Sequence, residues 1–256
     1  MNLCRAPLAW FAKAQSCREP GDAAAIRCIF SFGLILAFAP RLLIAQSPPP
    51  IAQQRSVVVL DAAHGGDDAG ASLGGQQEKA YTLAFSVRLR SLLAARGFQV
   101  VTTRESDASV DADRRADIAN HANAMACLSL HATDAGSGVH LFVSSLAPVI
   151  DARFMPWKTA QAAWITRSLT LAGVLNSALS HAGIAVTLGR VGMPALDSMT
   201  CPALAVEIAP QRTADSPGTE SLEDQGVQAQ LAEALAAALV EWRSQDRGSA
   251  RGASEP

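Results

Sequence analysis

The sequence contains no block of basic residues. Its 256 residues include 21 lysines and arginines against 23 aspartates and glutamates, which gives a formal net charge of −2. Proteins that bind nucleic acid concentrate positive charge in order to neutralise phosphates. We therefore expect no nucleic-acid partner.

Cysteine is scarce, and no two cysteines have the CxxC spacing of a thiolate zinc site or a thioredoxin-like motif. In the body of the chain, Cys127 and Cys201 each lie a few residues before a candidate site residue, on segments that read as strands. An exported protein could join them by a disulfide if those strands are neighbours. A small buried free thiol is the commoner state, and it is the state we expect.

No apolar run reaches the roughly 20 residues that a membrane-spanning helix requires. Instead, Arg27 precedes an apolar segment, 28–39, that leads to small residues, the pattern of a secretory signal. We expect residues 1–45 to be a signal peptide or targeting segment and residues 46–54 to be a proline-rich linker. The protein is then exported to the periplasm or cell envelope, with N-terminal membrane association before processing.

Strand-like and helix-like patterns alternate after the linker. Apolar runs predict strands, and apolar residues at helical spacing predict helices. This alternation predicts one α/β domain, 55–242, with a mainly parallel twisted sheet of about six strands and helices on both faces. The polar residues 243–256 are expected to form a disordered tail. The expected strands are 57–61, 98–103, 127–131, 139–144, 184–188 and 203–208, and the expected helices are 77–96, 110–126, 159–181 and 224–242.

Four potential zinc-site residues stand at the ends of these elements. His64, His131 and Glu207 end or follow a strand, and Glu78 opens a helix. In open α/β sheets, sites form beyond the carboxyl ends of the strands. Two imidazoles and a carboxylate with an open fourth position are typical of a catalytic zinc site, and a further carboxylate supplies a base.

Each candidate also has a structural explanation. His64 could be an ordinary turn residue, Glu78 a favourable charge at a helix N-terminus, and His131 a core histidine with satisfied hydrogen bonds. Glu207 is harder to explain in this way, because burying an unpaired carboxylate is costly. The remaining histidines, which we expect to be structural, are His121, His140 and His181.

The motifs around these residues resemble the zinc-dependent N-acetylmuramoyl-L-alanine amidases of the type-3 family, over about residues 55–242. The resemblance implies that His64, Glu78 and His131 bind Zn²⁺ and that Glu207 is catalytic. It implies as substrate the peptidoglycan amide between N-acetylmuramic acid and L-alanine. The matching motifs are Asp61-Ala62-Ala63-His64-Gly65-Gly66-Asp67-Asp68-Ala69-Gly70-Ala71, Glu78-Lys79, Thr103-Arg104 with Asp107, Arg115 with Ala119-Asn120, Ser129-Leu130-His131-Ala132, and Pro202-Ala203-Leu204-Ala205-Val206-Glu207-Ile208.

The chain departs from the family pattern around the site. Ala63 replaces a usual glycine, Ala69 a usual proline, Thr133 a usual Asn or Asp, and Ala209-Pro210 a usual Gly-Phe. A glycine held at positive φ cannot become alanine freely. We therefore expect these departures to alter the rim of the site and its substrate preference. Within the motifs that match the family, we expect Arg104 and Arg115 to be structural ion-pair partners, with Asp61 supporting the site or fixing a turn.

No glutamate occurs between His131 and Glu207. Some amidases of this family carry a helix in that interval, with a glutamate that plugs the zinc until a partner moves it. The prolines Pro148 and Pro156 also limit helix formation in the segment 146–158. We therefore expect no plug and no plug-releasing activator.

Two other functions use the same residues. A zinc peptidase or deacetylase would act on a different amide with the same ligands. A non-catalytic wall-binding module would bind peptidoglycan without turnover. The products formed, and the effect of replacing Glu207, distinguish these alternatives from the amidase.

Overall fold

The computed structural model describes residues 56–150, 154–213, 216–220 and 222–252. The expected targeting segment, 1–45, and the linker, 46–54, lie outside these residues. Within the described part, no helix combines the length and apolar character needed to cross a bilayer.

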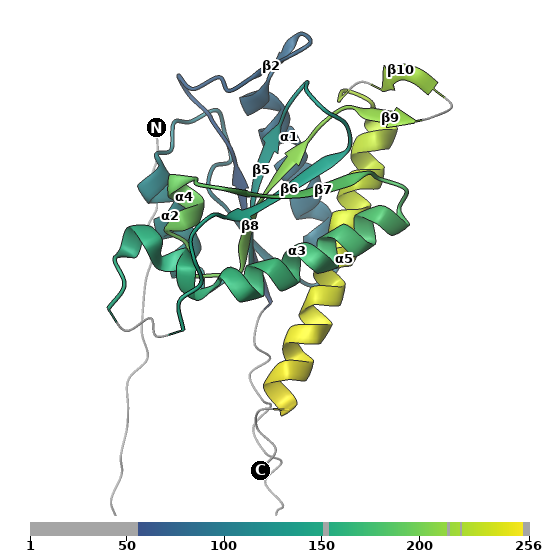
Figure 1. Cartoon of the computed structure of the whole chain (residues 1–256). Helices are drawn as coiled ribbons and strands as arrows, with labels where there is room; N and C mark the ends of the chain where they lie inside the picture. The colour runs from purple at the N-terminus through teal and green to yellow at the C-terminus, as the bar shows by residue number, and fades with distance from the viewer. Residues whose placement is uncertain (1–55, 151–153, 214–215, 221, 253–256) are drawn as a thin grey trace, which may run out of the picture. The chain divides into compact units, whose positions relative to one another are not determined.

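A six-stranded sheet forms the centre of the domain, in the order β4-β1-β5-β8-β6-β7 (Figure 1). The first four strands in this order pair in parallel. Strand β6 runs antiparallel to β8 and parallel to β7. The mainly parallel α/β sheet expected from the sequence is therefore confirmed. Its strands are Gln99–Thr102 (β4), Val57–Ala62 (β1), Ala126–Ala132 (β5), Ala203–Ile208 (β8), Val139–Ser144 (β6) and Val186–Val191 (β7).

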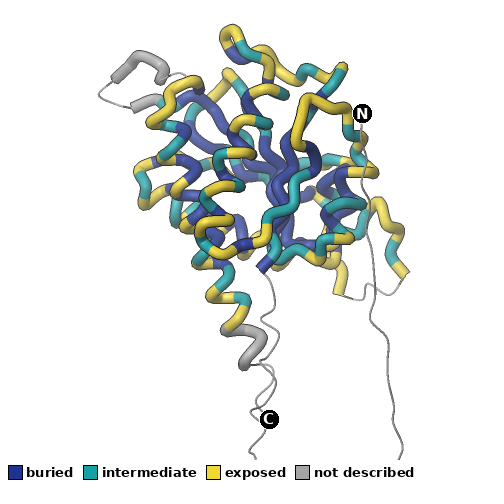
Figure 2. The backbone as a smooth tube through the Cα atoms, turned by 180° about the vertical axis from the view of Figure 1, so that it is seen from behind, coloured by how far each residue is buried: buried dark blue, intermediate teal, exposed yellow. Residues whose placement is uncertain are grey.

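Strand alternation divides the interior into two cores. Figure 2 shows the buried residues in dark blue at the centre of the domain. On β1, Val58 and Leu60 face one core and Val59 faces the other. The larger core packs against α1 (Glu78–Ala95), α3 (Ile165–His181) and α5 (Gln225–Gly252). The smaller core packs against α2 (Ala112–His121) and α4 (Pro194–Asp197). Because successive strand residues point to opposite faces, Ser129, His131 and Glu207 fall on the α2/α4 side.

Two short hairpins complete the described chain. Strands β2 (Ser72–Leu73) and β3 (Gln76–Gln77) pair just before α1, and β9 (Gln211–Thr213) pairs with β10 (Ser216–Glu220) after β8. Both hairpins lie near the end of the sheet at which β1, β5 and β8 terminate (Figure 1).

Two expected helices differ from those in the structure. The expected helix 110–126 is α2, which ends at His121 because Asn123 takes a positive φ of 47° and β5 begins at Ala126. The expected helix 159–181 is divided into the 3₁₀ segment η1 (Trp157–Ala163) and α3. The buried Gln161 side chain explains this division, because its amide donates to the carbonyls of Met199 and Cys201 instead of facing solvent.

The expectation of a disordered tail at residues 243–256 is wrong for residues 243–252, because α5 continues to Gly252, and the last four residues lie outside the described part. Side chains anchor this extension to the domain. Arg243 donates to the carbonyl oxygen of Arg96 at 2.9 Å, and its guanidinium lies 4.1 Å from the centre of the Phe98 ring. Asp246 forms an ion pair with Arg167 of α3. The polar composition of the segment thus reflects a helix with specific polar partners.

The expectation of free thiols is also wrong, because Cys127 and Cys201 form a disulfide. Cys127 lies on β5, and Cys201 lies two residues before the adjacent strand β8, where Ala203 pairs in register with Cys127. This brings the two Cα atoms within 6.3 Å of each other. The disulfide therefore joins β5, which carries His131, to the segment that enters β8, which carries Glu207.

Candidate metal centre

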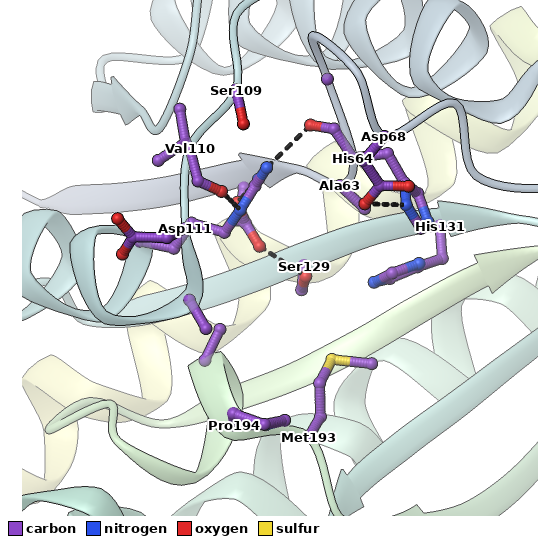
Figure 3. Close-up of a pocket in the computed structure, with 15 residues that line it drawn as sticks. Ala63, His64, Asp68, Ser109, Val110, Asp111, Ser129, His131, Met193 and Pro194 are labelled. Atoms are coloured by element: carbon purple, nitrogen blue, oxygen red, sulfur yellow. Dashed lines mark hydrogen bonds and ion pairs between the residues drawn. The ribbon is translucent and has the colours of Figure 1, made fainter.

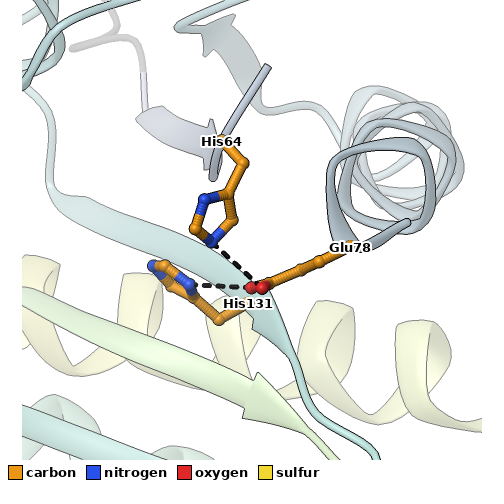
Figure 4. Close-up of side chains that lie close together, drawn as sticks. All are labelled: His64, Glu78 and His131. Atoms are coloured by element: carbon orange, nitrogen blue, oxygen red, sulfur yellow. Dashed lines mark hydrogen bonds and ion pairs between the residues drawn. The ribbon is translucent and has the colours of Figure 1, made fainter. Parts of the chain in front are cut away.

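Three of the four candidate site residues meet at the end of the sheet, as Figure 4 shows. Nε2 of His64 lies 3.0 Å from Oε2 of Glu78, and Nδ1 of His131 lies 3.0 Å from Oε1 of the same carboxylate. The three side chains each offer one donor atom, and these atoms all lie within 4.8 Å of one another. The sequence expectation that His64, Glu78 and His131 come together is thus met in geometry.

His64 is held in an unusual backbone conformation two residues after the end of β1. Its φ is 59°, and two arginines fix the carbonyl groups around it. Arg104 donates to the carbonyl oxygens of Ala62 and Ala63, both at 2.9 Å. Arg115 donates to the carbonyl oxygens of Ala62 and His64, both at 2.7 Å. These fixed carbonyls direct the imidazole to the end of the sheet.

Arg115 also forms a buried ion pair with Asp61, with a separation of 2.6 Å. The Asp61 carboxylate accepts further hydrogen bonds from the hydroxyls of Thr103 at 2.7 Å and Ser129 at 2.6 Å. The expected structural ion pair is therefore present for Arg115. Arg104 differs, because it acts mainly by donating to main-chain carbonyl oxygens.

Glu78 is the first residue of α1, and its carboxylate accepts two main-chain hydrogen bonds. Ala71 N–H donates to Oε2 at 2.9 Å, and Ala132 N–H donates to Oε1 at 3.1 Å. Burial raises the pKa of this carboxyl, but the contacts with His131, His64 and these amides outweigh it and hold the pKa far below its usual range. Glu78 is therefore an anion throughout the neutral range.

His64 is oriented by Asp68, whose Oδ2 lies 2.8 Å from Nδ1. This contact leaves Nε2 directed at Glu78 and the shared centre. The contact with Glu78 raises the pKa of His64, burial lowers it, and the contact with Asp68 raises it further, so that the net shift is upward. A carboxylate on the outer nitrogen is a common way of orienting a histidine that ligates a metal.

The donor set fits zinc. Imidazole nitrogens and a carboxylate oxygen are ordinary zinc ligands, and catalytic sites use three protein ligands with a fourth position left open. Gly70, at φ 65°, permits this crowding, since a Cβ there would lie 2.6 Å from Oε2 of Glu78 and 2.7 Å from Cδ2 of His64. The three donors therefore meet in a space that any larger residue at position 70 would partly fill.

A pocket of about 360 Å³ adjoins the centre and gives access to it (Figure 3). His64 and His131 form one side of the pocket, and the residues that begin α2 and α4 form the other. Its lining combines apolar and hydroxyl groups with the carboxylates of Asp61, Asp68 and Asp111 and the guanidinium of Arg115. The pocket thus places solvent-accessible space directly beside the imidazoles.

Glu207, the fourth candidate, lies beside this cluster in the sheet. It pairs in register with His131 across β5 and β8, and with His140 across β8 and β6. Oε2 of Glu207 lies 3.4 Å from Nδ1 of His140. The sequence expectation treated His140 as structural and so missed this contact. The position of His140 between apolar Val139 and Leu141 indicated that it faces away from the core that these two residues enter. The register of β6 against β8 was needed to identify Glu207 as its neighbour.

The other two histidines lie away from the centre. His121 ends α2, where Nδ1 lies 3.0 Å from Oδ1 of Asp117 and the side chain is 80% exposed. His181 is the last residue of α3. Neither belongs to the cluster of metal donors found among the described residues.

The altered rim residues fit the backbone without strain. Positive φ angles at residues other than glycine occur, in the described part of the chain, at His64 and Asn123, so Ala63 does not occupy the left-handed region. Thr133 N–H donates to the carbonyl oxygen of Ile208, and Ala209 N–H donates to that of Gly138, both at 2.9 Å. None of the altered residues therefore takes a positive φ in the described part of the chain.

Part of the chain matches known proteins in sequence. The family model described as N-acetylmuramoyl-L-alanine amidase (Amidase_3) matches residues 58–241. The amidase CwlM of Bacillus licheniformis is 39% identical over 83 residues, which cover 32% of this chain and 32% of that protein. The matched region thus spans about a third of that curated relative.

Two solved structures share the fold over almost their whole length. The catalytic domain of CwlV, an N-acetylmuramoyl-L-alanine amidase from Bacillus (Paenibacillus) polymyxa var. colistinus, has a TM-score of 0.57 and 25% identity, with 74% of this chain and 98% of that chain covered. The amidase AmiC2 of Nostoc punctiforme has a TM-score of 0.56 and 27% identity, with 73% and 97% covered. The chain therefore belongs to the N-acetylmuramoyl-L-alanine amidase family of the Amidase_3 type.

Proposed function

We propose that this protein is a zinc-dependent amidase that hydrolyses the amide between N-acetylmuramic acid and L-alanine in peptidoglycan. The observation that carries the proposal is the placement of His64, Glu78 and His131 around one point, with Glu207 in register beside His131. Family membership supplies the substrate class. The match to CwlM covers 32% of this chain and 32% of that protein, so the activity of the whole chain is part of the proposal.

His64, Glu78 and His131 would hold the zinc ion, through Nε2, a carboxylate oxygen and Nδ1 respectively. Zinc in this position supplies Lewis-acid chemistry, which polarises an amide carbonyl and makes water more acidic. The anionic state of Glu78 suits this role, since a ligand must give up its proton before it binds a metal. Asp68 would keep His64 in the tautomer that presents Nε2.

Glu207 would act as the general base and then as the general acid. An amide has a poor leaving group, so its hydrolysis requires a proton to be removed from water and delivered to the departing nitrogen. The Glu207 side chain is 32% exposed and therefore reachable by substrate. Its position one strand away from His131 places it about 5 Å from a ligand backbone, the usual spacing of neighbouring strands.

Export fits the chemistry of the chain, and we include it in the proposal. Peptidoglycan lies outside the cytoplasm, and disulfides such as Cys127–Cys201 persist in oxidising compartments. The targeting segment expected at residues 1–45 would direct the protein there. N-terminal membrane association before processing belongs to the same proposal.

We further propose that the centre is not plugged and needs no activating partner. The interval between His131 and Glu207 contains no glutamate, and its aspartates include Asp134 and Asp197. Asp197 is already engaged, because it accepts from the hydroxyl of Ser144 at 2.5 Å and from the amide of Met193 at 3.2 Å. Full activity of the purified protein alone supports this proposal, and activity that appears only after an activator is added contradicts it.

Digestion of purified peptidoglycan tests the proposed function. The expected product is a newly exposed L-alanine amine, released in the presence of zinc and absent after chelation. Glu207→Gln should retain bound zinc and lose about 10²- to 10⁴-fold in kcat, because general acid–base catalysis contributes a factor of that order. Glu105→Gln, an exposed carboxylate paired with Arg90, is the matched control and should retain activity. A different newly exposed amine would indicate a peptidase or deacetylase, and binding without release would indicate a wall-binding module.

A further inference from the structure

Three polar side chains stand in one row across the sheet. His131 of β5, Glu207 of β8 and His140 of β6 occupy paired positions in successive strands. Paired residues point to the same face, with neighbouring strands about 4.8 Å apart. Glu207 is therefore flanked by a histidine of the metal cluster on one side and by His140 on the other.

His140 contacts the Glu207 carboxylate directly. Nδ1 of His140 lies 3.4 Å from Oε2, and the two side chains are 21% and 32% exposed. Within the part of the chain that the structure describes, His140 is the one basic side chain recorded in contact with this carboxylate. Catalytic hydrogen bonds are often long without substrate and shorten in the reacting complex, so a separation of this size suits a site that tightens during catalysis.

The fold holds the His140 ring in place. Gly136, at φ 81°, passes so close to the ring that a Cβ there would lie 2.8 Å from Cε1 and 2.9 Å from Nε2. On the same face of β6, the Phe142 ring meets the imidazole edge to face, with the ring centres 6.4 Å apart. Contact from the glycine loop on one side and from an aromatic ring on another restricts the rotamers available to His140.

We propose that His140 is a positioning residue that fixes the carboxylate of Glu207 for proton transfer. The inference rests on the proposed function, in which Glu207 exchanges a proton with water and the leaving amine. Nδ1 and Oε2 lie 3.4 Å apart, so a small approach in the reacting complex would let Nδ1–H donate to Oε2 and leave Oε1 to carry the proton. A glutamate side chain has three rotatable bonds, so a fixed partner reduces the number of unproductive conformations.

Three variants test whether the function of His140 requires a hydrogen-bond donor at the position of Nδ1 or only a side chain of similar size. His140→Asn keeps a nitrogen donor at the distance from Cβ at which Nδ1 stands. His140→Gln carries its nitrogen one bond further out, at the distance of Nε2, and His140→Ala has no donor. With peptidoglycan as substrate, we expect kcat to fall about 10- to 100-fold in His140→Ala and His140→Gln, as for other groups that orient a reacting residue, and to recover in His140→Asn. KM and bound zinc should not change.

A readout without catalysis tests the same proposal. In crystal structures of the full chain loaded with zinc, the Glu207 carboxylate should occupy one conformation in the wild type and His140→Asn, and several in His140→Ala. His121→Ala, at the exposed end of α2, is the control for loss of a histidine. If the wild type releases no L-alanine amine, the proposed function fails, whereas the conformation of Glu207 still decides the role of His140.

Several results would overturn the inference. Unchanged kcat in His140→Ala, or equal rescue of kcat by His140→Gln and His140→Asn, would show that Nδ1 has no specific role. Loss of zinc from His140→Ala would indicate that His140 supports the metal centre and does not act on Glu207 alone. A single unchanged conformation of Glu207 in His140→Ala would show that other contacts fix the carboxylate.

Discussion

Nε2 of His64 lies 3.0 Å from Oε2 of Glu78, while Nδ1 of the same ring lies 2.8 Å from Oδ2 of Asp68. The imidazole therefore stands between two carboxylates. Contact with Glu78 raises the pKa of His64 above its ordinary value, burial opposes the shift, and Asp68 adds to it. A proton and a zinc ion consequently compete for Nε2.

This competition predicts that zinc affinity falls as the pH is lowered, beginning above pH 6.5, the ordinary pKa of histidine. Below the raised pKa, His64 carries a proton that zinc must displace, and above it the nitrogen is free. Calorimetric titrations from about pH 8 to about pH 6, in buffers of different ionisation enthalpy, measure the protons released for each zinc bound.

Asp68→Asn provides the control for the pH prediction. Removal of this carboxylate charge removes one cause of the raised pKa, so the fall in affinity should begin at a lower pH than in the wild type. Asp68 itself is exposed, and its replacement should leave the fold intact. Identical proton release in the two proteins would show that Asp68 does not control the titration of His64.

Gly70→Ala should weaken zinc binding far more than Gly74→Ala. The two glycines have similar φ angles, 65° and 67°, so both substitutions impose similar backbone strain. A Cβ at Gly70 would lie 2.6 Å from Oε2 of Glu78, whereas a Cβ at Gly74 meets nothing within 4 Å. Zinc stoichiometry after dialysis, together with Tm, separates loss of the metal from loss of stability. Equal zinc content in the two variants would contradict the prediction.

The sequence predicted those parts of the fold that depend on local pattern. The apolar runs of β6 and β8 gave both strands with their observed bounds, because alternation and apolar content are local properties. The division between η1 and α3 was not predictable, because it depends on hydrogen bonds from Gln161 to carbonyl groups 38 and 40 residues further along the chain. The extension of α5 similarly depends on Arg96 and Phe98, far away in sequence.

In the candidate site too, some features follow from local sequence pattern and others depend on contacts between distant segments. His64, Glu78, His131 and Glu207 could be singled out as candidates because each lies in a motif at the end of an element. The pairing of His140 with Glu207 depends on the antiparallel register of β6 against β8, which no local pattern encodes. The disulfide required the adjacency of β5 and β8, and composition alone favoured the free thiol.

Replacement of Arg115 by methionine should destabilise the protein by about 3–5 kcal/mol, the usual cost of removing one partner of a buried ion pair. The side chains of Arg115 and Asp61 are 9% and 3% exposed, so Asp61 would be left as a buried charge without its cation. Loss of the hydrogen bond to the His64 carbonyl should also reduce zinc affinity. Urea denaturation with and without chelator separates these two effects.

The neighbouring Arg114 offers a matched control on the same helix. It pairs with Asp117, but the two side chains are 63% and 44% exposed. Arg114→Met should therefore cost about 0–1 kcal/mol, as for other surface ion pairs. If the two substitutions have equal effects on the free energy of unfolding, the buried Asp61–Arg115 pair does not stabilise this rim of the sheet.

Joint replacement of Cys127 and Cys201 by alanine should lower the free energy of unfolding by about 2–5 kcal/mol, the usual cost of losing a native disulfide. The two cysteines are 74 residues apart in sequence, so the bond restricts a long loop of the unfolded chain. The main-chain pairing of β5 with β8 places His131 opposite Glu207 without the bond, so zinc content should persist in the folded variant. Urea denaturation and metal analysis of the oxidised protein measure the two quantities, and peptide mapping verifies the bridge in the wild type. A variant that unfolds at the same urea concentration as the wild type would show that the paired strands hold this part of the sheet together without the disulfide.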